Sequence, residues 1–371
     1  MLGTRGVPSV YGGFETCAEQ LGVRLVERGH EVTVYSRPHF VDPRLKEYRG
    51  IRLVSLPTVQ NKYLDTLAHV FLSSVHSLGQ RYDLCLYFIS GNSLVAWIPR
   101  LVGTRTVINV DGLDWQREKW PGPAKKYLQM AERLAPRLAN AALTDSRFVQ
   151  RYYAELYGAH IAHIAYGADV EPVPPGDTLR KWGLRPREYI LFVGRLVPEN
   201  HPDHLLDAFR SLAGTRGMKC VIMGDASYAD EYVQRVRAYE SEDVVFTGYV
   251  YGEGYRELTS NAYVFALTSS ASGTHPALLE AMGLGNCVVV NDTPENLEAM
   301  DRAGLSYLGK EGAGSLARML EWLLERPDVV EAYRQRAHEH VLRHYSWDVI
   351  TERYLALFSR VLSRRRRKKR R

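Results

Sequence analysis

The sequence lacks the features of three protein classes. None of its apolar runs is long enough to span a membrane. Its four cysteines are isolated from one another, which favours reduced core residues of a cytosolic protein over a disulfide framework. No group of cysteine and histidine shows metal-ligand spacing, and no Asp-x-Asp-like divalent site is present, so we expect no metal. The cysteines are Cys17, Cys85, Cys220 and Cys287.

Positive charge is scarce in the body of the chain and concentrated at its end. The net charge is +6, and residues 364–371 read RRRRKKRR. Subtracting these eight charges leaves −2 for the remainder, so the basic character belongs to a terminal run. Such a run is typically a disordered electrostatic arm. It suits anionic lipid headgroups or nucleic acid, and a solvated tail without a specific partner is the third reading.

The chain contains two successive series of apolar strands and helical patterns. At 371 residues it exceeds the usual size of a single core. The strands are apolar on both faces and rich in β-branched residues, as in parallel sheets covered by helices on both sides. This order predicts an α/β protein of two doubly wound domains. Strands are expected at 31–36, 51–56, 83–90, 105–110, 189–193, 218–224, 243–248, 262–268 and 286–290, with helices at 62–78, 123–139, 203–212 and 231–239.

A segment rich in proline and glycine, 165–177, lies between the two series and marks the linker. The expected parts are an N-terminal domain at 1–168, a C-terminal domain at 169–345, a closing helix at 346–362 and a basic disordered tail at 363–371. Only Met1 and Leu2 precede the first glycine loop, where a doubly wound domain should have a full strand. Since a missing central strand leaves neighbouring backbone groups unpaired, we expect further residues upstream of Met1.

The opening stretch, GTRGVPSVYGGFETCAEQL, combines a glycine-rich loop with a helix. Apolar residues recur at helical spacing from Phe14 to Leu25, and Gly29 is a plausible left-handed cap. A helix that begins after such a loop presents backbone N–H groups and the positive end of its dipole to an anion. The loop therefore predicts a phosphate site.

Two further signals lie in the second half. A strand delivers Gly194 and Arg195 to its carboxyl-terminal edge, where ligands bind in open α/β sheets, and arginine suits phosphate. The stretch SSASGTHPALLEAMG predicts a glycine turn and a helix capped by Thr274 or His275, with Pro276 as its first residue. Glu280 lies about one turn into that helix and can accept hydrogen bonds from ligand hydroxyls. Surface salt bridges are the alternative role for Arg195 and Glu280.

With these motifs in place, the chain resembles the retaining family-4 glycosyltransferases. The resemblance rests on Gly194-Arg195-Leu196, on LLEAMG and on the closing HYSWDVITERYLALF, and it covers nearly the whole chain. TRGVPSVYGGFET and VDGLDWQREKW resemble the branch of rhamnosyltransferases that build cell-surface polysaccharides on lipid carriers. The family implies the GT-B architecture, in which two Rossmann-like domains face a cleft and the last helix crosses back onto the first domain.

The resemblance also implies roles for individual residues. Arg195 would hold the donor diphosphate, Glu280 the ribose hydroxyls, and Asp111 would lie near the transferred sugar. Gly12 and Gly13 would let the backbone approach donor or acceptor. The other candidate substrate-binding residues are Arg5, Arg117, Lys119, Asn200, Gly273, Thr274 and His275.

The sequence departs from the family at two positions. Asn200 stands where relatives carry a lysine that serves as a second diphosphate cation, and Ser272 replaces the first of two glutamates. Because the leaving diphosphate must still be stabilised, Arg195, Arg5 and the two helix N-termini are the available groups.

The expected activity is metal-independent, retaining transfer of a hexose, with rhamnose favoured, from a nucleotide-diphosphate sugar to a glycan or lipid-diphosphate-linked acceptor. No cofactor is implied. The protein would be cytoplasmic and peripheral at the inner face of the cell membrane, attached to anionic lipid through its tail, without a specific nucleic acid. The alternatives are a nucleotide-sugar epimerase on the same fold and a nucleic-acid-binding protein that uses the tail.

Overall fold

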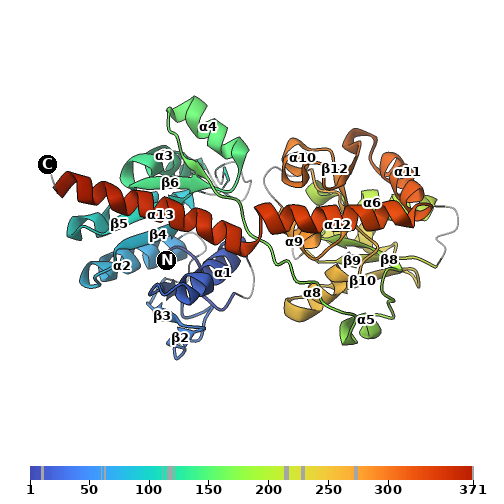
Figure 1. The fold of residues 1–371 in the computed structure, drawn as a ribbon, viewed down its shortest axis with the longest axis horizontal. Helices are drawn as coiled ribbons and strands as arrows, with labels where there is room; N and C mark the ends of the chain where they lie inside the picture. The colour runs from blue at the N-terminus through green and yellow to red at the C-terminus, as the bar shows by residue number, and fades with distance from the viewer. Residues whose placement is uncertain are drawn as a thin grey trace. The chain divides into compact units, whose positions relative to one another are not determined.

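The chain folds into two compact units, each described separately below (Figure 1). Unit 1 contains Met1–Tyr166 and Trp347–Arg371, and unit 2 contains Gly167–Ser346. The computed structural model describes residues 1–9, 12–59, 61, 64–110, 112–113, 115, 120, 122–212, 217–226, 230–270 and 275–369.

Unit 1 is built on parallel strands, of which β1, β4, β5 and β6 are largely buried on both faces. Its strands form two groups, with the orders β1-β3-β2 and β4-β5-β6-β7, and only β2 pairs antiparallel. Val107 of β5 faces Leu86 of β4 on one side and Ala141 of β6 on the other. Buried Tyr87 and Ile108 fill the core. The strands are β1 (Thr33–Ser36), β2 (Glu47–Tyr48), β3 (Ile51–Ser55), β4 (Leu84–Phe88), β5 (Arg105–Asn109), β6 (Ala141–Thr144) and β7 (Ala162–His163).

Met1 and Leu2 lie between the two strand groups. The Leu2 N–H donates to the Leu86 carbonyl at 2.8 Å, and the Leu2 carbonyl accepts from the Phe88 N–H at 3.0 Å. On the other side, the Met1 carbonyl accepts from the Tyr35 N–H at 3.1 Å. These two residues therefore occupy the position of a first strand, with β1 and β4 as its neighbours.

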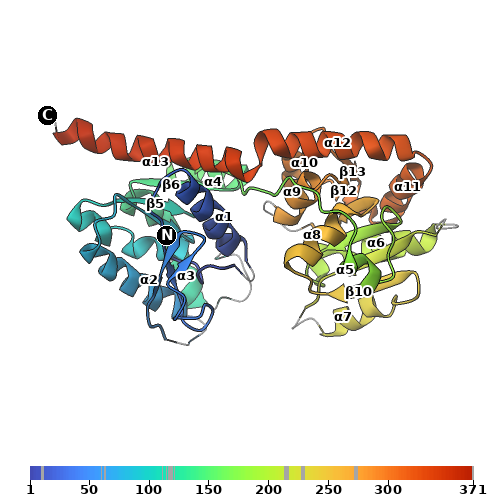
Figure 2. The same ribbon diagram turned by 60° about the horizontal axis from the view of Figure 1, so that its bottom comes forward.

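The helices of unit 1 cover this sheet, and the last helix of the chain packs beside the first (Figure 2). Arg28, which caps α1, contacts Asp348 at 2.9 Å and Glu352 at 3.0 Å. The Tyr354 hydroxyl lies 3.8 Å from the Cys17 sulfur inside the contact. The elements are α1 (Gly13–Glu27), α2 (Asp65–His76), η1 (Ser77–Gly79), η2 (Ser90–Val95), η3 (Ile98–Val102), α3 (Gly122–Leu138), α4 (Arg147–Tyr157) and α13 (Trp347–Lys369).

Unit 2 is a doubly wound sheet of six parallel strands in the order β10-β9-β8-β11-β12-β13. Numbered within the unit, this order is 3-2-1-4-5-6, so β8 and β11 flank the point where the winding reverses. Ligands of open α/β sheets bind at that point, beyond the carboxyl ends of the strands. The strands are β8 (Tyr189–Val193), β9 (Lys219–Met223), β10 (Val244–Gly248), β11 (Val264–Leu267), β12 (Cys287–Asn291) and β13 (Leu305–Tyr307).

The core of unit 2 lies on both sides of its sheet, under the covering helices. Phe192 and Phe265 are fully buried on the two central strands. The helices are α5 (Asp177–Lys181), η5 (Pro198–Asn200), α6 (Pro202–Ser211), α7 (Asp230–Arg237), α8 (Gly252–Ser260), α9 (Pro276–Gly283), α10 (Pro294–Met300), η6 (Gly309–Glu311), α11 (Ala313–Leu324) and α12 (Pro327–His344).

The fold class expected from the sequence is confirmed, including the two Rossmann-like domains and the final helix that returns to the first. The predicted disordered tail at 363–371 is a difference, because α13 continues through Lys369. Arginine and lysine are good helix formers, so a basic run can extend an existing helix. Within the described residues, no helix is both long and apolar enough to cross a bilayer.

Candidate functional site

The predicted arginine lies at the carboxyl end of β8, at the reversal point of unit 2. Gly194 continues the strand through its N–H, which donates to the Met223 carbonyl at 3.0 Å. Gly224 has φ +146°, and a Cβ there would lie 1.8 Å from the Gly194 carbonyl oxygen. Only glycine permits this close approach of the loops after β8 and β9. Arg195 comes next and is exposed.

Asn200 has a structural role that the sequence did not predict. Its Nδ2 donates to the Arg195 carbonyl at 2.9 Å, and its Oδ1 accepts from Ser269 Oγ at 3.0 Å. Its own carbonyl accepts from Thr268 Oγ1 at 2.7 Å. Asn200 therefore ties the loop after β8 to the end of β11 and holds the backbone of Arg195. A lysine at this position could not make the same bonds, because its side chain has no acceptor for the Ser269 hydroxyl.

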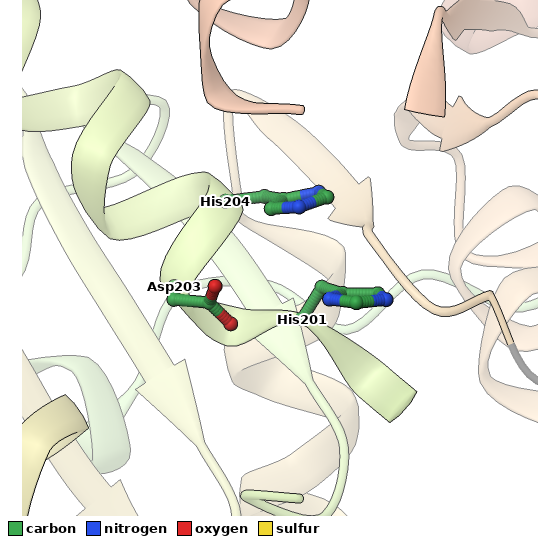
Figure 3. Close-up of side chains that lie close together, drawn as sticks. All are labelled: His201, Asp203 and His204. Carbon is green, nitrogen blue, oxygen red and sulfur yellow. The ribbon is translucent and has the colours of Figure 1, made fainter. Parts of the chain in front are cut away.

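His201, Asp203 and His204 gather at the start of α6 (Figure 3). Their potential ligand atoms lie within 4.8 Å of one another, which makes them a possible divalent-metal cluster. Each side chain also has a protein partner: Ser270 for His201 at 2.9 Å, Tyr307 for His204 at 3.1 Å, and Tyr232 for Asp203.

The cluster lies at the amino end of α6 and includes the Asp203 carboxylate. The two imidazole rings are stacked, with centroids 4.5 Å apart and an interplanar angle of 12°. They flank the amino end of α6, where the helix dipole is positive. The expected absence of a metal stays a prediction.

Helix α9 confirms the predicted arrangement of its first turn. His275 takes the N-cap position with φ −92°, and Pro276 is the first helical residue. Leu278, Leu279 and Met282 are completely buried, which fixes the rotation of the helix.

Glu280 is half-buried on α9 and accepts a hydrogen bond of 2.5 Å from the Tyr255 hydroxyl of α8. Burial raises the pKa of Glu280 to about 7, the bond from Tyr255 opposes this shift, and the negative charge of Asp169 adds to it. The protonated form of this carboxyl group is therefore populated at neutral pH. Tyr255 lies 25 residues before Glu280, so no local motif signals this pair.

In unit 1, the amino end of α1 carries its own carboxylate. Gly12 has φ +120°, and a Cβ there would lie 2.1 Å from Oε2 of Glu15. Oε1 of Glu15 accepts from the Arg5 N–H at 2.9 Å. The Arg5 guanidinium lies 5.0 Å from the centre of the Phe40 ring. Any phosphate at this predicted site must therefore share the helix end with Glu15.

Gly13 begins α1, where a Cβ would meet the Tyr166 ring at 3.6 Å. Five other predicted residues lie outside the part of the chain that the structure describes, so their contacts are not assigned. They are Asp111, Arg117, Lys119, Gly273 and Thr274.

Each unit matches a known domain family. Residues 12–167 match the family "Glycosyl transferase 4-like domain", and residues 178–340 match "Glycosyl transferases group 1".

Two curated relatives are enzymes of sugar transfer. The chain is 27% identical over 260 residues to a GDP-mannose-dependent alpha-mannosyltransferase of Mycobacterium tuberculosis, covering 66% of this chain and 65% of the relative. It is 26% identical over 284 residues to a D-inositol 3-phosphate glycosyltransferase of Kineococcus radiotolerans, covering 63% and 62%. The chain thus spans slightly less than two thirds of the length of these relatives.

Solved structures share the fold over almost the entire chain. Sucrose-phosphate synthase of Thermosynechococcus elongatus superposes with a TM-score of 0.75 at 18% identity, covering 95% of this chain and 94% of that one. Anabaena HepE in complex with UDP-glucose superposes with a TM-score of 0.75 at 19% identity, covering 94% and 96%. At such identities the likeness shows the fold.

Proposed function

Because the chain belongs to the glycosyltransferases that join a 4-like domain to a group 1 domain on the GT-B fold, we propose that it transfers a hexose from a nucleotide-diphosphate sugar to an acceptor hydroxyl. We further propose that the transfer retains the anomeric configuration and needs no metal. Rhamnose is the favoured sugar, because two stretches of the sequence resemble rhamnosyltransferases.

The observation that carries this proposal is the exposed Arg195 beyond β8, beside the reversal point of unit 2. Its guanidinium offers a forked set of donors to a diphosphate. Because Gly224 has no side chain, it leaves the Gly194 backbone beside Arg195 uncovered at this point. The amino end of α6 follows on the same loop and adds positive potential. Arg195 and this helix end would supply the positive charge that relatives obtain from a lysine at the position of Asn200.

Glu280 would accept hydrogen bonds from the ribose hydroxyls of the donor. It lies on the helix that follows β11, the strand next to β8, so diphosphate and ribose would span the reversal point. Tyr255 orients the carboxyl group through its hydrogen bond. Tyr255 is thus a positioning residue, and Glu280 a binding residue.

In the proposed reaction, the bond between the anomeric carbon and the diphosphate oxygen breaks while the acceptor oxygen bonds to the same face of that carbon. The departing diphosphate oxygen takes the acceptor proton. The protein then supplies position and charge rather than a nucleophile, and Arg195 stabilises the developing negative charge.

The acceptor would be a glycan or a lipid-diphosphate-linked sugar used in cell-surface polysaccharide synthesis. Such an acceptor would hold the enzyme at the cytoplasmic face of the cell membrane, where the basic end of the chain suits anionic lipid. Arg5, Gly12, Gly13, Asp111, Arg117 and Lys119 stay candidates for contacts with sugar or acceptor.

A panel of nucleotide sugars in a thermal-shift assay would identify the donor, since a ligand bound to the folded protein raises its melting temperature. Transfer would then be followed by NMR of the product, which reports the anomeric configuration. Arg195→Ala should lower kcat by about a hundredfold to a thousandfold, by analogy with removal of an oxyanion donor.

Arg185→Ala is the matched control, because Arg185 is exposed in the same unit and pairs only loosely with Glu188 at 3.7 Å. It should turn over at the wild-type rate. Conversion of the donor without acceptor would indicate an epimerase. Full activity of Arg195→Ala, or a product of inverted configuration, would contradict the proposed mechanism.

A further inference from the structure

The start of α6 brings together two histidines and an aspartate from four consecutive residues. His201 takes the N-cap position, Pro202 is the first helical residue, and Asp203 and His204 follow. One potential ligand atom from each of His201, Asp203 and His204 lies within 4.8 Å of the others, and all three side chains are half-buried. Figure 3 shows the two rings one above the other, with the carboxylate beside them. Three side chains of this kind on one turn form a candidate metal site.

The protein fixes the proton of the His204 ring on the nitrogen that faces Tyr307. Nδ1 of His204 lies 3.1 Å from the Tyr307 hydroxyl. That hydroxyl donates its one proton to the Thr268 carbonyl at 3.4 Å, so it accepts from His204. The lone pair of the neutral ring is therefore on Nε2. A Cβ on Gly312 would lie 3.2 Å from Nε2, so the glycine leaves space beside this nitrogen.

His201 and Asp203 are held by the same kind of contact. Nε2 of His201 lies 2.9 Å from the Ser270 hydroxyl, which donates to the Glu199 carbonyl at 3.3 Å. The His201 proton is therefore on Nε2, and the lone pair is on Nδ1. Oδ1 of Asp203 accepts from the Tyr232 hydroxyl, and Oδ2 has no hydrogen bond among the described residues. Each side chain thus has one atom bound to the protein and one left for a ligand, as is typical of metal-binding histidines.

The charges around the cluster are compatible with a cation. Burial lowers the pKa of His204, and the neighbouring His201 lowers it further, so the His204 ring is neutral at neutral pH. Asp203 and Asp207 oppose this shift of the pKa, so both carboxylates lie close enough to act on the ring. Pro202 has no N–H, so α6 lacks the first backbone donor that would repel a cation. The two carboxylates offset the positive end of the helix dipole.

We propose that Nδ1 of His201, Nε2 of His204 and a carboxylate oxygen of Asp203 bind a divalent transition metal, for which Zn²⁺ is the best match. Zn²⁺ binds imidazole nitrogens at about 2.0–2.1 Å and carboxylate oxygens at about 2.0–2.2 Å, and water can fill the fourth position of its tetrahedron. The two rings are nearly parallel in the structure, with centroids 4.5 Å apart. Binding of one ion by both rings therefore tilts their open edges toward each other.

This metal site is separate from the proposed transfer, which needs no metal. The metal motifs sought in the sequence combine cysteine with histidine or repeat aspartate, and residues 201–204, which read HPDH, do neither. The ion would act on the loop after β8. Asn200, which directly precedes His201, holds the Arg195 carbonyl at 2.9 Å. An ion that ties His201 to α6 would therefore restrain the loop that carries Arg195.

Calorimetric titration of Zn²⁺ into the full chain, without donor, tests the site. The variants are His201→Gln, His204→Asn and Asp203→Asn. Each keeps an atom of the same hydrogen-bonding type toward its protein partner and removes the nitrogen or charged oxygen that would bind the ion. His344→Gln is the matched control, because His344 is an exposed histidine on α12 of the same unit. Circular dichroism verifies that the variants fold.

The wild type and His344→Gln should bind one Zn²⁺ per chain, and Zn²⁺ should raise their melting temperatures. Tyr307→Phe, which removes the outer partner of His204, should weaken binding by about tenfold to a hundredfold, and each of the three ligand variants should weaken it more. No binding to the wild type, or equal affinity in the ligand variants, would overturn the proposal. Transfer by the wild type in excess chelator is measured separately, so either proposal can fail while the other stands.

Discussion

At the scale of the residue, the paired Tyr255 and Glu280 determine the expected pH dependence of donor binding. Glu280 has a folded-state pKa of about 7, so its ionised fraction increases as the pH rises through neutrality. A carboxylate accepts hydrogen bonds from hydroxyls more strongly than the neutral acid. Donor affinity should therefore increase between pH 6 and pH 8.

Glu280→Gln should remove this inflection and raise the donor KM by about tenfold to a hundredfold, the value of a lost charge-assisted hydrogen bond. Tyr255→Phe removes the hydrogen bond that lowers the Glu280 pKa, so the inflection should move to higher pH. Measuring the donor KM against pH for the wild type, Glu280→Gln and Tyr255→Phe checks both expectations. An unchanged inflection in Glu280→Gln would show that another group titrates.

His69 offers a test of stability in acid. Its Nε2 lies 3.1 Å from the Ser36 carbonyl, which can only accept, so the proton is on Nε2. Nδ1 is buried, with no partner among the described residues. Burial lowers the pKa of His69 to about 4, and the charge of Arg37 contributes.

Between pH 6.5 and pH 4 the unfolded chain therefore binds the His69 proton more readily, and the free energy of unfolding should fall as the pH falls. The loss approaches about 3 kcal/mol at full protonation. Urea unfolding of His69→Gln should show a flatter pH profile than the wild type. His160→Gln, at an exposed position, is the control, and an equally steep profile in His69→Gln would contradict the assignment.

At the scale of the element, the contact between α1 and α13 closes unit 1. Tyr354 is 1% exposed and contacts Cys17, whereas the Arg28 pairs with Asp348 and Glu352 lie at the surface. Tyr354→Ala should lower the free energy of unfolding by about 3 kcal/mol through cavity formation. Arg28→Ala should cost less than about 1 kcal/mol. Denaturation of both variants measures this, and the reverse ranking would mean that charges dominate the contact.

The sequence predicted those elements that have a complete local pattern. Helix α9 has a proline at its first position and a buried stripe, so its start and rotation were predicted correctly. The short strands β2, β6 and β13 were not among the predicted strands, because two to four residues give only a weak period. For α2 the sequence predicted a helix but not its orientation, which buries His69, Ser73 and Ser74 together with Val70. That orientation depends on Ser73 and Ser74 satisfying their hydroxyls inside the helix, which the spacing of apolar residues does not report.

The candidate site was predictable only as far as single loops allowed. Arg195 follows a strand, and Glu280 lies about one turn into a helix, so each could be identified from its local sequence. Asn200 makes two hydrogen bonds, to Arg195 and to Ser269, which depend on β8 lying beside β11. The hydrogen bond from Tyr255 to Glu280 joins two helices. Such contacts follow from the topology of the sheet rather than from neighbours in sequence.

At the scale of the whole molecule, two glycosyltransferase domains and a returning helix form one chain, and the proposed diphosphate site belongs to unit 2. A chain with these domains is expected to select one nucleoside diphosphate. Selection should depend on the reversal point between β8 and β11 rather than on the total charge of the chain, because the basic run lies in unit 1.

The most direct test of this claim is calorimetric titration of nucleoside diphosphates into the wild type, Arg195→Ala and Arg185→Ala. We expect one nucleoside diphosphate of the panel to bind the wild type. Arg185→Ala should bind it with equal affinity, and Arg195→Ala about tenfold to a hundredfold more weakly. Equal affinity in Arg195→Ala, or no binding of any nucleoside diphosphate, would contradict the account.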